Sequence, residues 1–380
     1  MKNAHPRRLA TLGVTLALGV VGLVATPAHA AYSETPRPEW SPRSPVFAIT
    51  VSGNRVYVGG AFTTLKDITT GKFVTRNRVA AFDASSGDLI SSFDPDVNGK
   101  VRAIAVSSDG GTVFLGGEFT SVNGVGRAKI AAVDTSGALV PGWDPSPSST
   151  VRDLVTVGSD LFLAGTFGKV NGKYRGGLAK VDASTGNLSD WKVPTKGGRP
   201  RSITASPNGS DLIVAGSFSA LEGSPRPFLG SATLGSGDVT SWAPPAACDT
   251  CDVFDVVATG SDVFGAVGGG GGRAVKWSGT TGAIDWIVRS DGNSQAVAVI
   301  GGTLYVGGHF GPTFAGQPRG QLAAVSASTG QLLPWAPDLG TRYFPGVWAL
   351  DASSDFLRVG GGFRSVGASE QARYAEFPVT

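Results

Sequence analysis

The sequence predicts an all-β fold, a seven-bladed β-propeller whose blades are four-stranded antiparallel sheets. Two short phrases recur along the chain at nearly even spacing, and all-β repeats of about 40 to 50 residues are typical of propeller blades. Of 380 residues, 56 are Gly and only 16% are charged, while the helix formers Glu and Lys are scarce. This composition excludes a helical bundle, and 41% hydrophobic residues exclude a disordered chain.

The first phrase is an apolar strand that ends in two small residues, one variable residue and Phe. It begins at Val56, Val113, Leu161, Leu212, Leu304 and Phe356, and a degraded copy spans residues 263–272. The second phrase is an aromatic residue followed by Pro two or three positions later. It occurs at Trp40, Phe93, Trp143, Trp191, Trp242, Trp286 and Trp335, with gaps of 44 to 53 residues, and Trp286 alone lacks the Pro. The two periods agree and predict seven blades.

Each repeat is expected to hold four strands separated by turns. In the second repeat, strand one is residues 101–106, strand two carries the Gly-Gly phrase, strand three is residues 129–134, and strand four ends at the aromatic residue. Ser-Asp-Gly at 108–110 and Pro-Asn-Gly at 207–209 are suited to hairpin tips, because Gly and Asn accept positive φ. The expected order within each blade is therefore antiparallel.

The two ends of the chain are predicted to complete one blade together. Residues 38–42 read as a fourth strand without a blade, and residues 373–379 as a third strand without a successor. Pairing of these N- and C-terminal strands would close the ring and remove the free edges of an open array. Residues 31–380 would then form a single propeller domain.

Residues 1–30 are predicted to be a secretory signal peptide. A positively charged start precedes an apolar run at 9–24 and a small-x-small cleavage site at 28–30. The Arg7-Arg8 pair leaves twin-arginine export open beside the general secretory route. The mature protein is therefore expected to be secreted or extracellular.

The mature chain has no net charge to attract polyanions. The leader holds three of the 32 basic residues, so 29 Lys and Arg remain against 29 Asp and Glu. Without a global positive field, nucleic acid and anionic lipid are not expected partners, and no later stretch is long enough to span a membrane. We expect a monomer whose partner is an extracellular small molecule, glycan or protein.

The only two cysteines lie close together as Cys248-Asp-Thr-Cys251. An exported protein meets oxidising conditions, which favour a local disulfide. A redox-active pair is the alternative, although Asp249 and Asp252 would disfavour a reactive thiolate. We expect a structural disulfide, since two thiols alone cannot complete a zinc site.

The phrases taken together resemble a known family. Gly-Gly-x-Phe, followed by Arg, by Leu-Ala-Ala-Val-Asp-x-x-Thr-Gly-x-Leu and by Trp-x-Pro, is similar to the secreted bacterial propellers built from delta-60 repeats and to kelch-like fungal cell-polarity markers. The resemblance covers nearly the whole mature chain and implies a propeller in a secreted or surface protein, without a specific activity. A weaker similarity links Ala-Ala-Val-Asp-x-x-x-Gly-x-Leu-x-x-Trp to quinoprotein dehydrogenases. The eight blades, calcium-bound quinone and adjacent cysteines of those enzymes have no counterpart in this sequence, so no catalytic residue or cofactor is carried over.

One arginine recurs near the start of each predicted third strand. Its positions are Arg76, Arg127, Arg175, Arg226, Arg319 and Arg373, with Arg273 in the short repeat. A ring of anion-binding arginines is one interpretation. A structural tie to neighbouring carbonyls or carboxylates explains the recurrence better, because a scaffold contact is needed once in every blade.

The residues that differ between repeats are the candidate site. The second residue of each first strand enters the blade beside the central channel. These residues are Phe47, Arg102, Arg152, Arg201, Phe254, Gln295 and Trp348. One arc is basic and the other mostly aromatic, which is suited to a ligand with an anionic group and a flat or sugar-like face.

A structural role for these residues is the alternative. The three arginines could pair with Asp94, Asp144, Asp153 or other loop carboxylates. The aromatic residues could plug the channel mouth as part of the core. The sequence does not choose between an open mouth and a plugged one.

An extracellular enzyme is the alternative function. Asp153, Asp255 and Asp351 fall on predicted first strands, where carboxylates from different blades could serve a carbohydrate lyase or hydrolase as acid and base. A serine triad would require His309 as its only base, since it is the one histidine beyond the leader. No defined calcium loop is present, and we expect neither metal nor cofactor.

These observations predict a secreted propeller that acts as a binding or interaction module. The ligand is expected at the channel mouth and would be an acidic sugar or another anionic small molecule. An enzyme that uses the channel carboxylates, or a quinoprotein-like oxidoreductase, is the second possibility.

Overall fold

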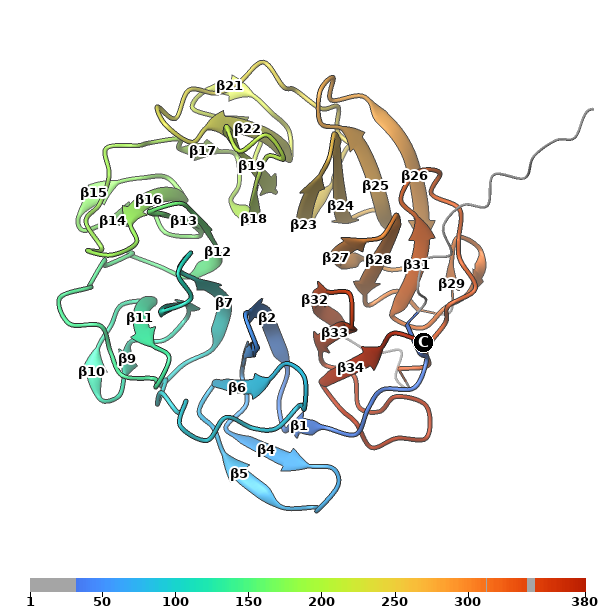
Figure 1. Ribbon diagram of the computed structural model, residues 1–380. Helices are drawn as coiled ribbons and strands as arrows, with labels where there is room; N and C mark the ends of the chain where they lie inside the picture. Colours follow the sequence, from blue (N-terminus) through green and yellow to red (C-terminus); the bar gives the residue numbers. More distant parts are fainter. Residues whose placement is uncertain (1–31, 312, 340–345) are drawn as a thin grey trace, which may run out of the picture.

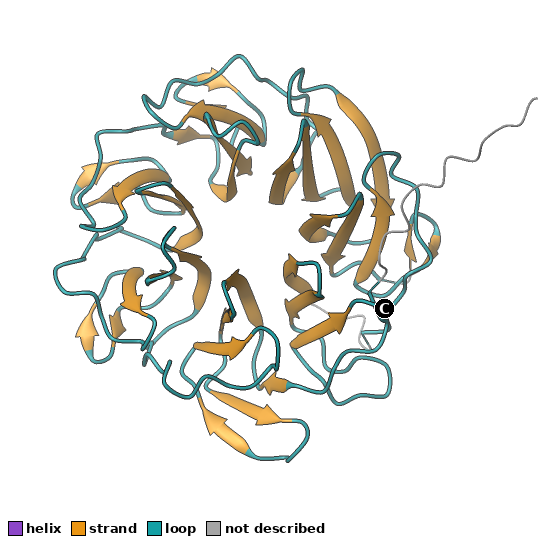
Figure 2. Ribbon diagram, in the orientation of Figure 1, coloured by secondary structure: helices purple, strands orange, loops and turns teal. Residues whose placement is uncertain are grey.

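The computed structural model describes residues 32–311, 313–339 and 346–380, and the predicted signal peptide lies outside this part of the chain. The described residues form strands, turns and loops but no helix (Figure 2). The prediction of an all-β fold is therefore confirmed. None of these residues forms a helix with the length and hydropathy needed to cross a membrane.

The strands form small antiparallel sheets arranged around a common centre (Figure 1). In the first sheet, β2 (Val46–Ser52) pairs with β3 (Arg55–Gly60), which pairs with β6 (Val79–Asp83). The later sheets repeat this order: β7 (Val101–Val106), β8 (Thr112–Gly117) and β11 (Ile130–Asp134); β12 (Val151–Val157), β13 (Asp160–Gly165) and β16 (Leu178–Asp182); β18 (Pro200–Ala205), β19 (Asp211–Gly216) and β22 (Leu229–Thr233); β23 (Asp252–Thr259), β24 (Asp262–Gly268) and β25 (Gly272–Ser278); β27 (Ser294–Ile300), β28 (Thr303–Gly308) and β31 (Leu322–Ser326); β32 (Val347–Ala352), β33 (Phe356–Gly361) and β34 (Tyr374–Pro378). The first strand of each sheet lies nearest the centre.

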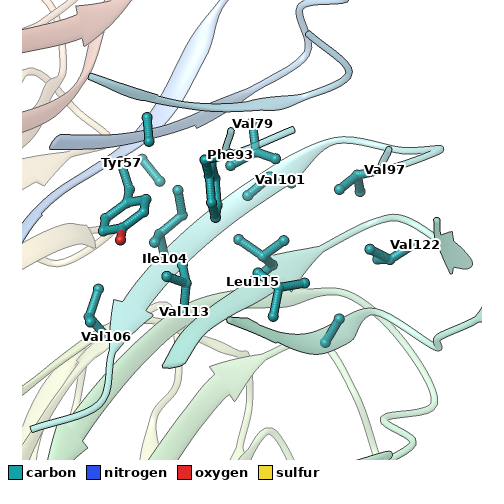
Figure 3. Packing of buried hydrophobic residues seen from close by; sticks show 14 of the residues in the cluster. Tyr57, Val79, Phe93, Val97, Val101, Ile104, Val106, Val113, Leu115 and Val122 are labelled. Carbon is teal, nitrogen blue, oxygen red and sulfur yellow. The ribbon is translucent and has the colours of Figure 1, made fainter. Parts of the chain in front are cut away.

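The hydrophobic core lies between neighbouring sheets. Tyr57 and Phe93 from the first repeat pack with Val101 and Leu115 from the second (Figure 3). The Gly-Gly phrase permits this close approach, because a Cβ on Gly59 would come within 2.6 Å of the Val101 side chain. Apolar side chains of adjacent repeats thus bury one another, and no single repeat has a core of its own.

The predicted fourth strand is regular in only one of these sheets. In most of the others, a single residue that lies three or four positions before the aromatic forms an isolated bridge to strand three, as Leu89 does to Phe82. The exception is β26 (Ile284–Ser290), which contains Trp286 and pairs along β25. Pro follows every other aromatic of this series, and Pro cannot continue a ladder because it has no N–H. The prediction of four-stranded blades was therefore wrong for the repeats whose aromatic residue precedes Pro.

Small outer hairpins, which the sequence reading missed, lie between strands two and three of most repeats. They are β4 (Thr64–Asp67) with β5 (Phe73–Thr75), β9 (Ser121–Val122) with β10 (Val125–Gly126), β14 (Lys169–Val170) with β15 (Lys173–Tyr174), β20 (Ala220–Leu221) with β21 (Ser224–Pro225), and β29 (Thr313–Phe314) with β30 (Gln317–Pro318). The segment after the preceding aromatic pairs with such a hairpin, as β17 (Thr195–Lys196) does with β20. Each hairpin therefore links consecutive repeats.

The N-terminal segment contacts the last sheet in a register that differs from the prediction. Residues 32–37 lie along β34, where Ser33 N donates to Pro378 O at 2.7 Å and Arg37 N donates to Glu376 O at 3.0 Å (Figure 1). In contrast, β1 (Trp40–Pro42) pairs with β4. The expected pairing of residues 38–42 with 373–379 was therefore wrong in register, because the aromatic segment joins the outer hairpin as it does in other repeats.

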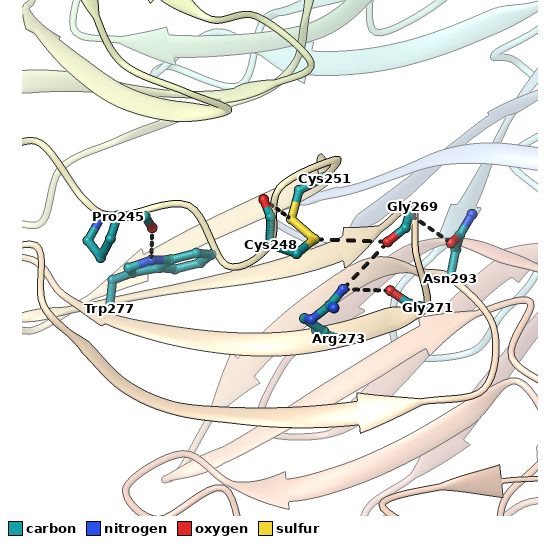
Figure 4. The surroundings of a disulfide bond; sticks show 8 residues. All are labelled: Pro245, Cys248, Cys251, Gly269, Gly271, Arg273, Trp277 and Asn293. Carbon is teal, nitrogen blue, oxygen red and sulfur yellow. Dashed lines mark hydrogen bonds between the residues drawn. A yellow bond between two sulfur atoms is a disulfide. The ribbon is translucent and has the colours of Figure 1, made fainter.

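Cys248 and Cys251 lie at disulfide distance, with Cα atoms 5.4 Å apart (Figure 4). They lie in the connection that leads to β23, and Cys251 is buried. In the same region Trp277 Nε1 donates to Pro245 O at 3.2 Å, and the Arg273 guanidinium donates to Gly271 O at 2.8 Å. The cysteine pair thus lies in a connection that is also held by backbone contacts.

Candidate functional site

A β-bulge interrupts every first strand at the position predicted for the site. In β2, Val46 pairs with Gly60 and Ala48 with Gly59, so Phe47 is the extra residue. Arg102, Arg152, Arg201, Phe254, Gln295 and Trp348 are the extra residues of β7, β12, β18, β23, β27 and β32. A bulge redirects a side chain out of the ladder. The Gly-Gly phrase faces the bulge, and a Cβ on Gly60 would lie 2.3 Å from Pro45 O.

All seven predicted residues line one cavity of about 280 Å³. The bulge residues form its rim together with the residues that follow them in the first strands. The structure therefore brings the basic and aromatic side chains together, as the sequence predicted. We call this cavity with its seven bulge residues the channel mouth.

Arg102 is held at the channel mouth by a carboxylate and an aromatic ring. Its Nε lies 2.5 Å from Glu118 Oε1, and its guanidinium carbon lies 4.8 Å from the centre of the Phe47 ring. Lys100 Nζ also approaches Glu118, at 3.3 Å. Burial alone would raise the pKa of Glu118, but the hydrogen bond and charge of Arg102, with Lys100, lower it. Glu118 therefore stays ionised and neutralises part of this side of the mouth.

Arg201 has the same kind of environment on the opposite side of the basic arc. Its Nε donates to Asp252 Oδ1 at 2.6 Å, and Nη2 contacts the other carboxylate oxygen. The guanidinium carbon lies 4.6 Å from the centre of the Phe254 ring. This two-point contact with a carboxylate fixes the guanidinium plane.

Arg152 lies between these two arginines and differs from both. Within the part of the chain that the structure describes, its guanidinium makes no ion pair and no hydrogen bond. The undescribed residues contain no Asp or Glu, so they offer no side-chain carboxylate. Burial, followed by the charges of Arg201 and Arg102, lowers the pKa of Arg152. The centre of the basic arc is therefore a half-buried cation without a carboxylate partner.

The aromatic residues Phe47, Phe254 and Trp348 belong to the first strands on the other side of the ring from Arg152. The Trp348 ring makes edge-to-face contacts with Phe47, at 6.4 Å between centroids, and with Phe254, at 6.3 Å. Gln295 comes between Phe254 and Trp348 in the order of the first strands and is 3% exposed. Its Oε1 is buried and accepts no hydrogen bond from the described residues. The mouth thus combines a cation, aromatic faces and an unused acceptor.

The channel carboxylates connect neighbouring first strands. Asp153 accepts hydrogen bonds from Ile203 N at 2.7 Å and Leu154 N at 2.8 Å. Asp255 accepts from Ser202 Oγ at 2.9 Å and from Val297 N at 2.9 Å. Burial raises the pKa of Asp153 to about 7 and also raises the pKa of Asp255.

Asp351 has a different partner. Its Oδ1 lies 3.8 Å from Arg358 Nη1, and burial raises its pKa. Asp351 is therefore held apart from the other two, whereas Asp153 and Asp255 interact, since the charge of Asp255 adds to burial in raising the pKa of Asp153.

His309 occupies the position in its repeat that Glu118 occupies in the second repeat. His309 N donates to Asn293 O at 3.1 Å, which matches the contact of Glu118 N with Lys100 O at 2.9 Å in the second repeat. Burial lowers the pKa of His309. Within residues 32–311, 313–339 and 346–380, no three His, Cys, Asp or Glu side chains cluster in a way that could hold a metal ion.

The recurring arginines lie outside the channel mouth and bind backbone carbonyls. Arg175 Nη1 donates to Tyr174 O at 2.9 Å and Nη2 donates to Ser189 O at 2.6 Å. The same contact with the carbonyl of the preceding residue is made by Arg76, Arg127, Arg226 and Arg319. This arrangement agrees with the predicted structural tie and gives no support to a ring of anion-binding arginines.

Arg373 was assigned to this series in error. Arg373 N donates to Phe363 O, as Arg78 N does to Phe62 O, so Arg373 corresponds to Arg78 rather than to Arg76. Gln371 occupies the arginine position of the last repeat. Its Nε2 donates to Tyr374 O at 2.8 Å. The last repeat lacks the usual arginine, and Arg373, two residues after Gln371, resembles it in sequence only.

The sequence reading found the bulge residues but missed their carboxylate partners. Glu118 and Asp252 hold Arg102 and Arg201, whereas Asp94 and Asp144 contact the recurring arginines Arg76 and Arg127. A usable signal existed for Glu118, since the variable residue of the Gly-Gly-x-Phe phrase directly follows the two glycines that face the bulge. Asp252 carried no comparable signal.

Comparisons with known proteins identify the fold. No protein-family profile and no curated protein matches this sequence. The chain is similar in structure to the computationally designed Ika8 protein, with a TM-score of 0.55, 14% identity, and coverage of 89% of this chain and 97% of that one. It is also similar to the WD40 β-propeller domain of Doa1, with a TM-score of 0.53, 11% identity, and coverage of 90% and 96%. At such identities the likeness shows the fold alone, which is a β-propeller.

Proposed function

We propose that the chain is a closed seven-bladed propeller of the delta-60 type that is exported from the cell. Contacts between neighbouring first strands run through the whole series, and β2 contacts β32. A Cβ on Gly360 would come within 2.6 Å of Val46, which is the relation of Gly59 to Val101. These contacts support closure, and the cysteine pair at disulfide distance is compatible with export.

The N-terminal segment supplies the last repeat with an acceptor that other repeats contain themselves. Trp143 Nε1 donates to Ala183 O at 3.0 Å, in the turn after the next third strand. Trp335 Nε1 donates to Ser33 O at 3.2 Å. Because Ser33 takes the place of that turn, the N-terminus stands in for the missing end of the last blade.

We further propose that this propeller is a binding module whose channel mouth takes a small anionic ligand. The observation that carries the proposal is Arg152, a half-buried guanidinium in a cavity without a carboxylate partner. Keeping a third positive charge beside Arg102 and Arg201 is unfavourable unless an anion joins it. A carboxylate or phosphate would form charge-assisted hydrogen bonds with the open fork of Arg152.

The rest of the channel mouth indicates an acidic sugar as the ligand. A cavity of about 280 Å³ is suited to a small molecule. Sugars and aromatic rings both stack on faces such as those of Trp348 and Phe47. Gln295 Oε1 needs a donor, and a hydroxyl group can supply one. A uronate unites these features, since it has one carboxylate, several hydroxyls and an apolar face.

An extracellular enzyme is less well supported. Asp153 and Asp255 line the cavity of the channel mouth, and each already accepts at least two hydrogen bonds. Those donors are mainly backbone amides of adjacent strands. A structural role, in which each carboxylate links two neighbouring first strands, accounts for both residues without a catalytic function.

The test is calorimetric titration of the mature protein with uronate-containing and neutral sugars at two salt concentrations. We expect uronates to bind, with affinity that falls as salt rises, and neutral sugars to bind weakly or not at all. Arg152→Ala should weaken binding by about 10-fold to 150-fold, which corresponds to the loss of hydrogen bonds to a charged group. Arg152→Lys keeps the charge but removes the planar fork, so it should recover only part of the affinity.

A matched control is Arg55→Ala, since Arg55 lies at the far end of β3 and its guanidinium contacts Thr135 O. This variant should bind as the wild type does. If no acidic or neutral sugar binds, or if Arg152→Ala and Arg55→Ala weaken binding equally, the channel mouth is a structural feature and the proposal is wrong.

A further inference from the structure

A second cavity lies where the two ends of the chain meet. It has a volume of about 400 Å³. One wall is β1, Arg43 and Lys66 of β4, and the other is the loop between β33 and β34, residues 364–373. We call this cavity the seam groove. It is separate from the channel mouth, because the two share no lining residue.

The seam groove carries a surplus of positive charge. Its basic residues are Arg43, Lys66, Arg364 and Arg373, and its one acidic residue is Glu370. Glu370 is engaged by Lys66, with 2.6 Å between Nζ and Oε2. Three arginines therefore remain without a carboxylate within the groove.

No carboxylate elsewhere neutralises these arginines. None of the three makes an ion pair with any described residue, and every Asp and Glu of the chain is described. Arg373 Nη1 contacts only a carbonyl, that of Pro42, at 3.3 Å. Burial, and then the charges of Arg364 and Arg43, lower the pKa of Arg373. The three arginines line one cavity, and the positive charges of Arg43 and Arg364 disfavour that of Arg373.

Two of these arginines occur only at the seam. Arg364 follows the Phe of the last Gly-Gly-x-Phe phrase, where the other complete phrases have Thr, Gly or Ser. Arg43 follows Trp-Ser-Pro, where the matching Asp-Pro and Ala-Pro pairs are followed by Asp, Ser or Pro. The fold needs no arginine at these positions, because the other repeats are built without one. A role in binding explains them better than a role in the scaffold.

Two contacts position Arg43 beside the cavity, whereas Arg364 is exposed at its edge. Arg43 N donates to Thr64 O at 3.0 Å, which anchors its backbone beside β4. Its guanidinium carbon lies 5.4 Å from the centre of the exposed Phe73 ring. Ser365 also lines the groove and offers a hydroxyl. The groove therefore combines three guanidinium groups and a neutral donor on two elements that close the chain.

We propose that the seam groove binds a phosphate group. A phosphate offers oxygens in several directions and can accept from three arginines at once, whereas a single carboxylate offers two oxygens in one plane. The volume exceeds that of one phosphate, so the natural ligand carries further atoms or a second phosphoryl group. Because the groove joins residues 41–43 to residues 364–373, a bound phosphate also holds the two chain ends together.

The experiment is titration of the mature protein with pyrophosphate, followed by calorimetry and by thermal unfolding. We expect saturable binding and a melting temperature that rises with pyrophosphate, because a ligand that binds only the folded state stabilises it. Arg364→Ser and Arg43→Ser introduce residues that other repeats tolerate, so both variants should fold. Each should weaken pyrophosphate binding by about 10-fold to 150-fold.

Two controls separate a site from a general salt effect. Arg289→Ser removes one exposed arginine from β26 and should bind pyrophosphate as the wild type does. Arg152→Ala should also leave this binding intact, so the seam groove and the channel mouth can fail independently. Anions can stabilise proteins by exclusion from the surface, and such an effect would be equal in all variants. Equal shifts in every variant, or no saturable binding, would overturn the proposal.

Discussion

Two sets of arginines in this protein differ in what their side chains bind. Five of the recurring arginines bind the carbonyl of the preceding residue, as Arg175 binds Tyr174 O; they are Arg76, Arg127, Arg175, Arg226 and Arg319. The three arginines of the channel mouth have three different environments. Arg102 binds Glu118, Arg201 binds Asp252, and Arg152 binds no carboxylate.

This difference indicates which positions of a repeat protein can acquire a binding site. A side chain that satisfies backbone carbonyls is needed in every repeat, so its partner never changes. The bulge residue in a first strand leaves the ladder, and the fold therefore sets no requirement on its chemistry. Aromatic, basic and amide side chains all occur there. Arg43 and Arg364 of the seam groove also occupy positions at which the other repeats have different residues, so the fold does not require an arginine there.

The largest effect is expected when the last repeat loses its N-terminal partner. A chain that begins at residue 38 lacks the backbone contacts of Ser33 and Arg37 with β34, and it leaves the buried Glu376 with one arginine fewer. Breaking a buried ion pair costs several kcal/mol, so we expect a loss of about 5 kcal/mol or more in the free energy of unfolding. Denaturant unfolding of this chain and of one that begins at Tyr32 measures the difference.

A synthetic peptide of residues 32–37, the segment that the shortened chain lacks, provides the control. If the missing segment closes the last sheet, the peptide should bind the shortened chain and restore part of the lost stability. Equal unfolding curves for the two chains would mean that the ends do not stabilise the propeller.

The second prediction tests the recurring arginines directly. Arg175→Ala removes two hydrogen bonds from a residue that is 5% exposed. The partly buried carbonyls of Tyr174 and Ser189 would lose their donors, and we expect a loss of about 1 to 3 kcal/mol. Arg175→Gln should lose less, because Gln371 serves this position in the last repeat. Thermal unfolding is the measurement, and Arg152→Ala should leave stability unchanged; a larger loss for Arg152→Ala would reverse the comparison.

The repeat pattern was enough to predict the all-β fold and to single out the second residue of each first strand, although not the bulge in which it lies. Val101–Val106 agrees with the predicted strand one, because an apolar run bounded by turns has few other solutions. The register of the N-terminus was not predictable, since it depends on Trp40 joining an outer hairpin that the repeat pattern did not predict. The equivalence of Gln371 with the recurring arginines was also not predictable, because an arginine, Arg373, lies only two residues away in the sequence. The local sequence pattern therefore predicts where strands form, whereas the pairing of the N-terminal segment depends on contacts between residues far apart in the sequence.

The third prediction concerns the buried charges at the seam. Burial, followed by the neighbouring Glu376, raises the pKa of Glu39 to about 8, although Arg37 and Arg358 lower it and Asp88 raises it further. The folded state therefore holds a proton that the unfolded chain releases above its ordinary pKa near 4.5. By linkage, the contribution of Glu39 to stability falls as pH rises from about 4.5 to about 8 and changes little outside that window.

Glu39→Gln removes this titration. We expect the variant and the wild type to be similar at pH 4.5 and the variant to be more stable by about 1 to 3 kcal/mol at pH 9. Denaturant unfolding across this pH range, with Glu34→Gln as an exposed control, measures the effect. A difference that is the same at every pH would show that Glu39 does not titrate in this window.

The smallest expected effect lies in the aromatic arc of the channel mouth. Trp348 touches Phe47 and Phe254 edge to face, and an aromatic contact contributes about 0.5 to 1.5 kcal/mol beyond its burial. Trp348→Ala should therefore weaken uronate binding by about 2-fold to 13-fold, and Trp348→Phe should keep most of the affinity. The salt dependence of binding should stay as in the wild type, because stacking neutralises no charge. Arg152→Ala should instead reduce that dependence, since it removes an ion contact. If Trp348→Ala flattens the salt dependence as much as Arg152→Ala does, the ring positions the arginines and does not stack on the ligand, and the division into a basic arc and an aromatic arc is wrong.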